Sequence, residues 1–240
     1  MPVALSQGQT IALDEESGHY VRTVLRLKKA SPMIVFNGSG GEYAATVAEV
    51  SRKNVLLTID QWHDRCVESS LKLILGLGIA RSDRMDLAVQ KSVELGVNEI
   101  TPVLTERSVL QLTEEKKTQR CLHWQKIVQH ATEQCGRTTL PALNGIATFA
   151  EWIKRQQGLK LFLDPYAQMS LVELTPINNQ VTLLTGPEGG FAAHERDSVK
   201  TLGFIPVCLG KRILRTETAS LAALSAMQML WGDFNNKGIE

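Results

Sequence analysis

The chain has 240 residues, which is enough for one large domain or two smaller ones, each with its own buried core. Hydrophobic residues make up 43% and charged residues 21%, a composition typical of a folded globular protein and not of a disordered one. The 26 basic and 25 acidic residues almost cancel. A nucleic-acid partner would therefore have to bind a local basic surface.

Cysteine spacing and the amino terminus limit the class of protein further. The four cysteines are widely separated, include no C-x-x-C pair and form no cysteine–histidine metal pattern. They predict reduced thiols, no bound metal and a cytoplasmic location. The amino terminus shows no signal-peptide pattern, and no apolar run reaches the roughly 18 residues that a membrane helix needs. We therefore expect no membrane partner.

Residues 1–70 are predicted to form a small β-rich domain. Three short β-prone runs, 32–36, 42–50 and 54–60, are separated by glycine-rich or polar turns. Their regular spacing favours a barrel. Near residue 70 the pattern changes, and we place the domain boundary there.

The segment before these strands, residues 19–27, has a helical period. A helix there would turn its valines and Leu25 inward and gather His19, Arg22 and Arg26 on the opposite face. Such a basic face fits an RNA-binding surface, although a solvated amphipathic helix is the more common explanation of it.

Residues 71–240 alternate between strand and helix patterns. Alternation of this kind predicts a parallel sheet with helices on both faces. The predicted strands are 71–77, 99–104, 159–164, 181–185 and 204–209, and the predicted helices are 83–95, 113–135, 148–157, 192–202 and 218–231. Arg137, in the loop after the second helix, is a candidate phosphate ligand, although such an arginine often pairs locally.

Two of the predicted strands end in unusual loops. The strand 181–185 is followed by Gly186-Pro-Glu-Gly-Gly190, where glycines expose backbone N–H groups and let a flat or anionic ligand approach the main chain. The strand 204–209 is followed by Gly210 and then by Arg215, which precedes a helix. If the two strands are parallel and adjacent, both loops face one pocket at the carboxyl edge of the sheet.

Two familiar nucleotide-binding patterns are incomplete. Gly76-Leu-Gly78 begins like a dinucleotide fingerprint, but Arg81 stands at its third glycine position. Gly210-Lys211 resembles the end of a P-loop, but Arg212 replaces the required serine or threonine. The sequence therefore supports neither an ordinary Rossmann site nor an NTPase site.

Together these segments resemble the bacterial 16S ribosomal RNA uridine-N3 methyltransferases of the RsmE type, in the SPOUT superfamily. The resemblance covers nearly the whole chain, and its motifs keep their order. They are His19 with Val24-Leu-Arg26, Asp83-Arg-Met85, Gln90-Lys-Ser-Val-Glu-Leu-Gly96, Thr105-Glu-Arg-Ser108, Glu133-Gln-Cys-Gly-Arg137, Gly186-Pro-Glu-Gly-Gly-Phe191 and Leu209-Gly-Lys-Arg-Ile-Leu-Arg-Thr-Glu-Thr-Ala219. The chain departs from the family at its start, where Met1-Pro-Val-Ala-Leu-Ser6 replaces an arginine-bearing segment, and at Cys135, where serine is usual.

The resemblance implies a PUA-like β-barrel that binds RNA at residues 1–70 and a SPOUT domain at 71–240 whose carboxyl end forms a trefoil knot. It implies S-adenosylmethionine as cofactor, 16S rRNA in the 30S subunit as substrate, and a homodimer. The cofactor-binding residues that carry over are Leu184, Thr185, Gly186, Pro187, Glu188, Gly189, Gly190, Leu209, Gly210, Ile213, Leu214, Arg215 and Thr216. The RNA-binding candidates are His19, Arg22, Arg26 and Arg137.

The predicted chemistry is methyl transfer to N3 of a uridine, for which Arg215 and Glu217 are the catalytic candidates. Arg215 would stabilise the negative charge of the deprotonated base. Glu217 would either accept a proton or hold Arg215 in place. The alanine-rich helix from Thr218 is expected at the dimer interface or in the core of its own domain. Two alternatives remain: a non-catalytic RNA-binding protein of ribosome assembly, and a methyltransferase for another RNA.

Overall fold

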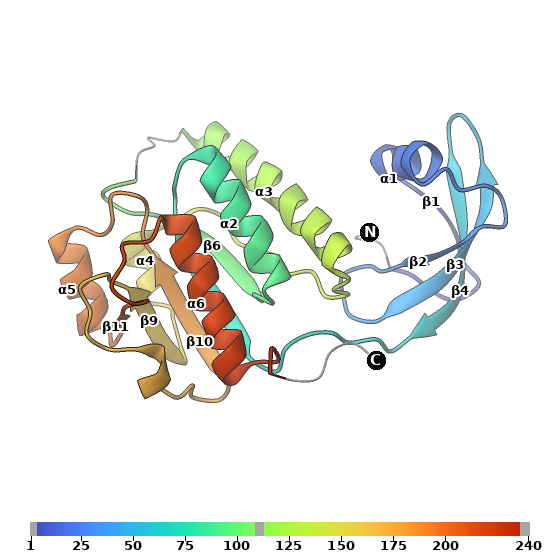
Figure 1. The fold of residues 1–240 in the computed structure, drawn as a ribbon. Coiled ribbons are helices and arrows are strands. Elements are labelled where there is room, and N and C mark those ends of the chain that lie inside the picture. Colours follow the sequence, from blue (N-terminus) through green and yellow to red (C-terminus); the bar gives the residue numbers. More distant parts are fainter. Residues whose placement is uncertain (1–3, 109–112, 236–240) are drawn as a thin grey trace. The chain divides into compact units, whose positions relative to one another are not determined.

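The computed structural model describes residues 4–108 and 113–235. The chain divides into two compact units (Figure 1). The first unit runs to Val67 and also includes Gly136–Leu140, and the second is formed by Glu68–Cys135 and by the chain from Pro141 onwards. In the described part of the chain, no helix is both long and apolar enough to cross a membrane.

The first unit is built on an antiparallel sheet with the strand order β1-β4-β3-β2. Its strands are β1 (Thr10–Ala12), β2 (Pro32–Val35), β3 (Glu42–Val50) and β4 (Val55–His63). Alternate residues of β4, Val55, Leu57 and Ile59, point into the core, which follows from the two-residue period of a strand. Two register shifts between β3 and β4 bend the sheet.

The predicted barrel is not closed by strand pairing in the described residues, because β1 pairs only with β4 and β2 only with β3. The edge strands are short, and a helical segment supplies part of the core instead. This segment consists of α1 (Glu15–His19) and a π-helical turn, η1 (Tyr20–Val24). Val21, from that turn, belongs to the same hydrophobic cluster as the strands.

The predicted helical period of residues 19–27 is only partly right. Val21 is buried as expected, but the side chains of Val24 and Leu25 are 58% and 44% exposed. The physical reason is the π-helical turn, whose wider repeat shifts the residues after Val21 away from the inward face.

Residues Gly136–Leu140 are held to the first unit by specific hydrogen bonds. The Arg65 guanidinium donates to the backbone oxygen of Gly136 at 2.8 Å, and the Thr138 hydroxyl donates to the backbone oxygen of Arg65 at 3.1 Å. A β-bridge joins Gly38 and Thr139. Five residues that are remote in sequence thus become part of the first unit.

The second unit contains a parallel sheet with the order β11-β9-β10-β5-β6-β7, in which β8 also pairs with β6. Its strands are β5 (Lys72–Gly78), β6 (Glu99–Leu104), β7 (Ala142–Leu143), β8 (Ala147–Thr148), β9 (Leu159–Leu163), β10 (Gln180–Thr185) and β11 (Ile205–Val207). Its helices are α2 (Ser82–Glu94), α3 (Glu114–Cys135), α4 (Phe149–Ile153), the short 3-10 helix η2 (Leu171–Glu173), α5 (Ala193–Thr201) and α6 (Thr216–Trp231). The predicted parallel sheet is confirmed.

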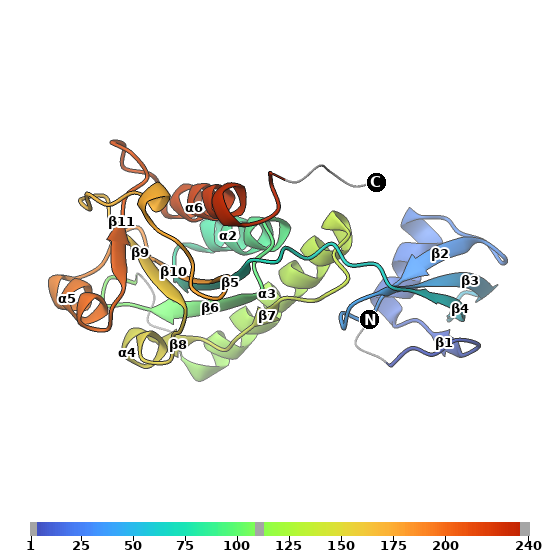
Figure 2. The same ribbon diagram turned by 90° about the horizontal axis from the view of Figure 1, so that it is seen from below.

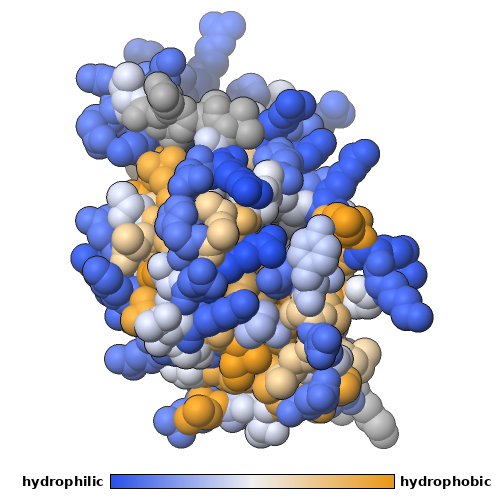
Figure 3. Space-filling view, turned by 90° about the vertical axis from the view of Figure 1, so that its left-hand side faces the viewer, coloured by the Kyte–Doolittle hydropathy of each residue, from blue (hydrophilic) through white to orange (hydrophobic). Residues whose placement is uncertain are grey.

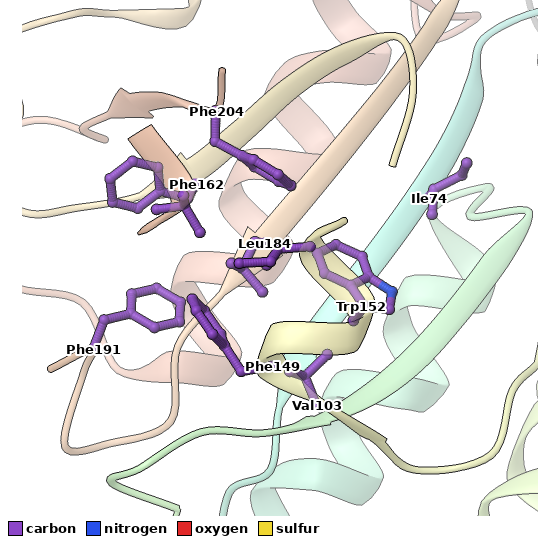
Figure 4. Close-up of a cluster of buried hydrophobic side chains, with 10 residues drawn as sticks. Ile74, Val103, Phe149, Trp152, Phe162, Leu184, Phe191 and Phe204 are labelled. Carbon is purple, nitrogen blue, oxygen red and sulfur yellow. The ribbon is translucent and has the colours of Figure 1, made fainter. Parts of the chain in front are cut away.

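Helices cover both faces of this sheet, as predicted (Figure 2). On one face, α4 and α5 pack on an aromatic cluster that includes Phe162, Phe191 and Phe204 (Figure 4). On the other face, α6 packs against α2 and buries Ala223 and Met227. The alanine-rich helix is therefore a core helix of its own unit on that side.

The strand order brings several loops to one edge. Because all pairings of this sheet are parallel, the carboxyl ends of β9, β10 and β11 share an edge. The two strands that precede the glycine loops, β10 and β11, are parallel but not adjacent, because β9 lies between them. The trefoil knot at the carboxyl end of the chain stays a prediction.

Candidate functional site

A cavity of about 480 Å³ lies at the carboxyl edge of the parallel sheet, in the second unit. Both predicted glycine loops line it: residues 185–190 after β10, and Leu209, Gly210 and 213–216 after β11. Although β9 separates the two strands, their loops line the same cavity, together with residues that follow β9. The structure thus brings together nearly all the predicted cofactor-binding residues.

Two of the predicted cofactor-binding and catalytic residues lie outside the lining of this cavity. Leu184 is fully buried in the aromatic cluster on the α4 face of the sheet. Glu217 lies in the first turn of α6, half-buried, and its Oε2 atom has no hydrogen-bond partner in the described part of the structure. Glu217 and Arg215 are two positions apart at the start of a helix, a spacing that does not place their side chains face to face.

The first glycine loop is a tight turn that depends on close backbone packing. The Gly190 N–H donates to the backbone oxygen of Pro187 at 2.8 Å, and Gly190 has a φ of +65°, which favours glycine. Gly78, at the end of β5, lies directly beneath this turn. A Cβ atom at Gly78 would come within 2.7 Å of the Pro187 nitrogen. Gly78 therefore lets the two backbones approach.

Two arginines from other elements hold the same loop. The Glu188 carboxylate accepts from the Arg84 guanidinium of α2 at 3.3 Å and from the backbone N–H of Arg81 at 3.1 Å. The Arg107 guanidinium donates to the backbone oxygen of Gly189 at 3.0 Å. These contacts tie the loop after β10 to α2 and to the segment after β6.

The second loop ends at Arg215, the residue that immediately precedes α6. Thr216 is buried, and the Ser220 hydroxyl, one turn further along α6, bonds to that of Thr185 at 3.1 Å. The start of α6 is thereby fixed to the end of β10. The Arg215 side chain is exposed on the cavity, and its guanidinium has no protein partner among the residues that the structure describes. It is free to meet a ligand.

The structure adds lining residues that the sequence analysis did not assign. The charged and aromatic ones include Arg84, Arg107, Asp164, Tyr166 and Arg196. Asp164 and Tyr166 follow directly after β9, so the signal available in the sequence was a polar residue at the carboxyl end of a buried strand. The three arginines lie on α2, on α5 and after β6, and only the folded chain shows that they converge.

The basic residues predicted to bind RNA all lie in the first unit. His19 and Arg26 are exposed, and Arg22 is half-buried with its guanidinium 3.5 Å from the backbone oxygen of Ser51. Arg137 differs from them because only 5% of its surface is exposed. A role for Arg137 in RNA binding stays a prediction that would require it to become accessible.

The helix that carries His19 has a defined start. The backbone N–H of Ser17 donates to the Asp14 carboxylate at 2.7 Å, and this bond lowers the pKa of Asp14 below its ordinary value of 3.8. The cap is therefore charged at neutral pH.

Comparison with protein families defines the class of this chain. Residues 67–228, more than half of the chain, match the family model of the RNA methyltransferase domain, and residues 13–60 match that of the RNA methyltransferase PUA domain. The second match confirms the predicted PUA-like character of the first unit. A fold with these two parts is that of an RNA methyltransferase.

Proteins that match this chain over nearly its full length identify the family within the RNA methyltransferases. The chain is 36% identical to ribosomal RNA small subunit methyltransferase E of Buchnera aphidicola over 96% of this chain and 95% of that protein. A solved structure of ribosomal RNA small subunit methyltransferase E from Neisseria gonorrhoeae, bound to S-adenosyl methionine, matches with a TM-score of 0.90 and 36% identity over 98% of both chains. A putative methyltransferase of Legionella pneumophila, in complex with the cofactor SAM, matches with a TM-score of 0.93 and 36% identity over 97% of both chains. The chain belongs to the ribosomal RNA small subunit methyltransferase E family.

Proposed function

We propose that this protein transfers the methyl group of S-adenosylmethionine to N3 of a uridine in the 16S rRNA of the small ribosomal subunit. The observation that carries the proposal is the cavity that two glycine-bearing loops and the free guanidinium of Arg215 share. Family membership supports the reaction class and the small-subunit RNA substrate. The proposed reaction places the protein in the cytoplasm, where ribosomes assemble.

The cavity fits the proposed cofactor. Its volume of about 480 Å³ lies within the usual range of small-molecule sites. Space is open where a side chain of Gly190 or Gly210 would project, so a ligand can approach the backbone there. The backbone of 186–190 and 209–216 would hold the adenosine part, and Asp164 offers an acceptor on the wall. When bound, S-adenosylmethionine supplies an electrophilic methyl group on a sulfonium.

The residues of the chain would then prepare the uridine. N3 of a neutral uracil carries a proton, so the N–H bond must break as the N–CH₃ bond forms, and negative charge spreads onto the neighbouring carbonyl oxygens. Arg215 would stabilise that charge, because its guanidinium is exposed on the cavity and unpaired among the described residues. Alignment of the base with the methyl donor would supply much of the rate.

Glu217 is the second residue that we propose to act in this chemistry. It does not line the cavity, so it would act only when substrate or a second subunit completes the site. Of the two roles left open by the sequence, holding Arg215 has no support from the described residues, in which the buried Oε2 atom of Glu217 has no hydrogen-bond partner. A buried carboxylate oxygen without a partner is suited to accept a proton once substrate or a second subunit completes the site.

The proposal is tested by methyl transfer from labelled S-adenosylmethionine into 30S subunits from cells that lack this activity, followed by nucleoside analysis. We expect 3-methyluridine in the 16S rRNA. If the cofactor binds but no 3-methyluridine forms on 30S subunits, on free 16S rRNA or on tRNA, the protein is a non-catalytic RNA-binding protein of ribosome assembly. Product on tRNA alone would assign it another RNA substrate.

The first unit is proposed to bind the RNA backbone through His19, Arg22 and Arg26. Replacing the exposed Arg26 by glutamine should weaken RNA binding and reduce the slope of log K against log salt by about 1, the loss of one phosphate contact. Filter binding at several salt concentrations measures both quantities. The matched control is Arg52→Gln, an exposed arginine of the same unit that we assign no RNA contact. An equal loss in both variants would contradict a specific role for Arg26.

We further propose a homodimer through the outer face of α6. While Ala223 and Met227 face the core of the unit, Ala222, Met229 and Leu230 on the same helix are exposed. A second copy would cover these apolar side chains. Light scattering of the purified protein should give twice the chain mass of 26.5 kDa, and a monomeric peak would refute the dimer.

A further inference from the structure

Tyr166 presents an exposed aromatic ring at the rim of the candidate cavity. It follows β9 at the carboxyl edge of the sheet, it lines the cavity, and 73% of its surface is exposed. A single exposed aromatic side chain is common on protein surfaces and by itself indicates nothing. Tyr166 differs because hydrogen bonds hold its backbone and a guanidinium group contacts one side of its ring.

The backbone of Tyr166 is fixed by the preceding aspartate. The Tyr166 N–H donates to the Asp164 carboxylate at 3.0 Å, and the Ala167 N–H donates to the backbone oxygen of Asp164 at 3.0 Å. Asp164 is itself tied to the sheet, because its N–H donates to the backbone oxygen of Val207 at 3.0 Å. The ring is therefore carried by a rigid turn and not by a loose loop.

Arg196 of α5 lies against the ring. Its guanidinium carbon is 5.6 Å from the ring centroid, within the range of a cation–π contact, and its Nη1 atom is 3.6 Å from the Asp164 carboxylate. The guanidinium is thus held by the carboxylate and supports the ring from one side, which leaves much of the ring open. Most of the side chains on the side of the protein that carries α5 and β11 are hydrophilic (Figure 3).

We propose that Tyr166 is a stacking platform for an unpaired base of the RNA substrate, an inference that rests on the proposed function. A base that reacts at N3 must leave its base pair, because N3 lies on the pairing edge, and an unpaired base is commonly held by stacking on an aromatic ring. The ring lines the cavity and is largely exposed, so a large substrate can reach it. Arg107 and Arg212, on the same rim, supply positive charge for the neighbouring phosphates.

The cofactor's adenine is the other nucleobase that could use this ring. A bound small molecule usually has roughly 70–90% of its surface buried, which favours the recessed space between the two glycine loops over an exposed rim. Stacking of the RNA base therefore fits the exposure of Tyr166 better, and separate measurement of cofactor and RNA affinity distinguishes the two.

The test compares Tyr166→Ala, Tyr166→Phe and the control Val172→Ala, an exposed residue of the same β9–β10 connection that does not line the cavity. For each variant we measure the KM for unmodified 30S subunits and the binding of those subunits by co-sedimentation. Calorimetry gives the Kd for S-adenosylmethionine. Tyr166→Ala should weaken 30S binding and raise this KM by about 5- to 150-fold, the usual effect of removing one base–aromatic stack. The Kd for the cofactor, the salt dependence of RNA binding and the Tm should be unchanged.

Tyr166→Phe keeps the ring and should behave as the unaltered protein does, as should Val172→Ala. The inference is overturned if Tyr166→Ala binds 30S subunits normally, if it weakens cofactor binding as much as RNA binding, or if Tyr166→Phe is equally impaired. Failure of the proposed function is seen separately, because the unaltered protein would then transfer no methyl group.

Discussion

Replacing Arg215 by alanine is expected to lower kcat for methyl transfer by about 10²- to 10³-fold, the usual effect of removing one donor that stabilises transition-state charge. The expectation rests on position, because Arg215 lies where the loop after β11 meets α6, exposed on the cavity and without a protein partner among the described residues. The Kd for S-adenosylmethionine should change little. Single-turnover kinetics with saturating cofactor and 30S subunits measure the chemical step.

Two further variants give this experiment its controls. Arg215→Lys keeps the charge but loses the planar fork of donors, so an intermediate rate is expected. Arg155→Ala removes another exposed arginine of the same unit, one that does not line this cavity, and the rate should stay as it is. If Arg215→Ala leaves kcat intact and instead weakens cofactor binding, Arg215 is a cofactor-binding residue and the proposed charge stabilisation is wrong.

Gly78→Val should distort the predicted cofactor site by displacing the glycine loop after β10, without itself contacting the cofactor. The new Cβ would lie 2.7 Å from the Pro187 nitrogen and 2.8 Å from the Gly186 carbonyl carbon, both backbone atoms that cannot turn aside. Overpacking of this kind costs about 1–3 kcal/mol of stability, and the least expensive relaxation is displacement of the glycine loop. We expect a lower Tm and a rise of about 10-fold or more in the Kd for S-adenosylmethionine, since about 1.4 kcal/mol of that cost amounts to a factor of ten in affinity.

Gly145→Val is the matched control for this substitution. Gly145 belongs to the same unit, has no positive φ, and a Cβ atom added there would meet no neighbour within 4 Å, so both the Tm and the Kd should stay close to those of the unaltered protein. Calorimetric titration and thermal unfolding of the two variants are compared side by side. Equal cofactor affinity in Gly78→Val and the unaltered protein would show that the loop does not depend on its contact with β5.

The elements of the second unit were predictable because their residue patterns are local. The strand predicted at 99–104 is β6, Glu99–Leu104, and the helix predicted at 83–95 is α2, Ser82–Glu94. Apolar runs of five or six residues and a helical period closed by a glycine are enough to identify such elements. The short strands β7 and β8 and the π-helical turn were not predicted, because two to five residues carry too little pattern.

The sequence by itself determined the alternation of strand and helix, the glycine loops after two strands, and Arg215 at the start of α6, since each is a property of consecutive residues. Only the tertiary structure decided that β9 lies between β10 and β11 and that Gly136–Leu140 joins the first unit. The same is true of the cation–π contact between Arg196 and Tyr166 beside the cavity. These features join residues that are far apart along the chain. Their positions follow from how strands pair and helices pack, which no local pattern records.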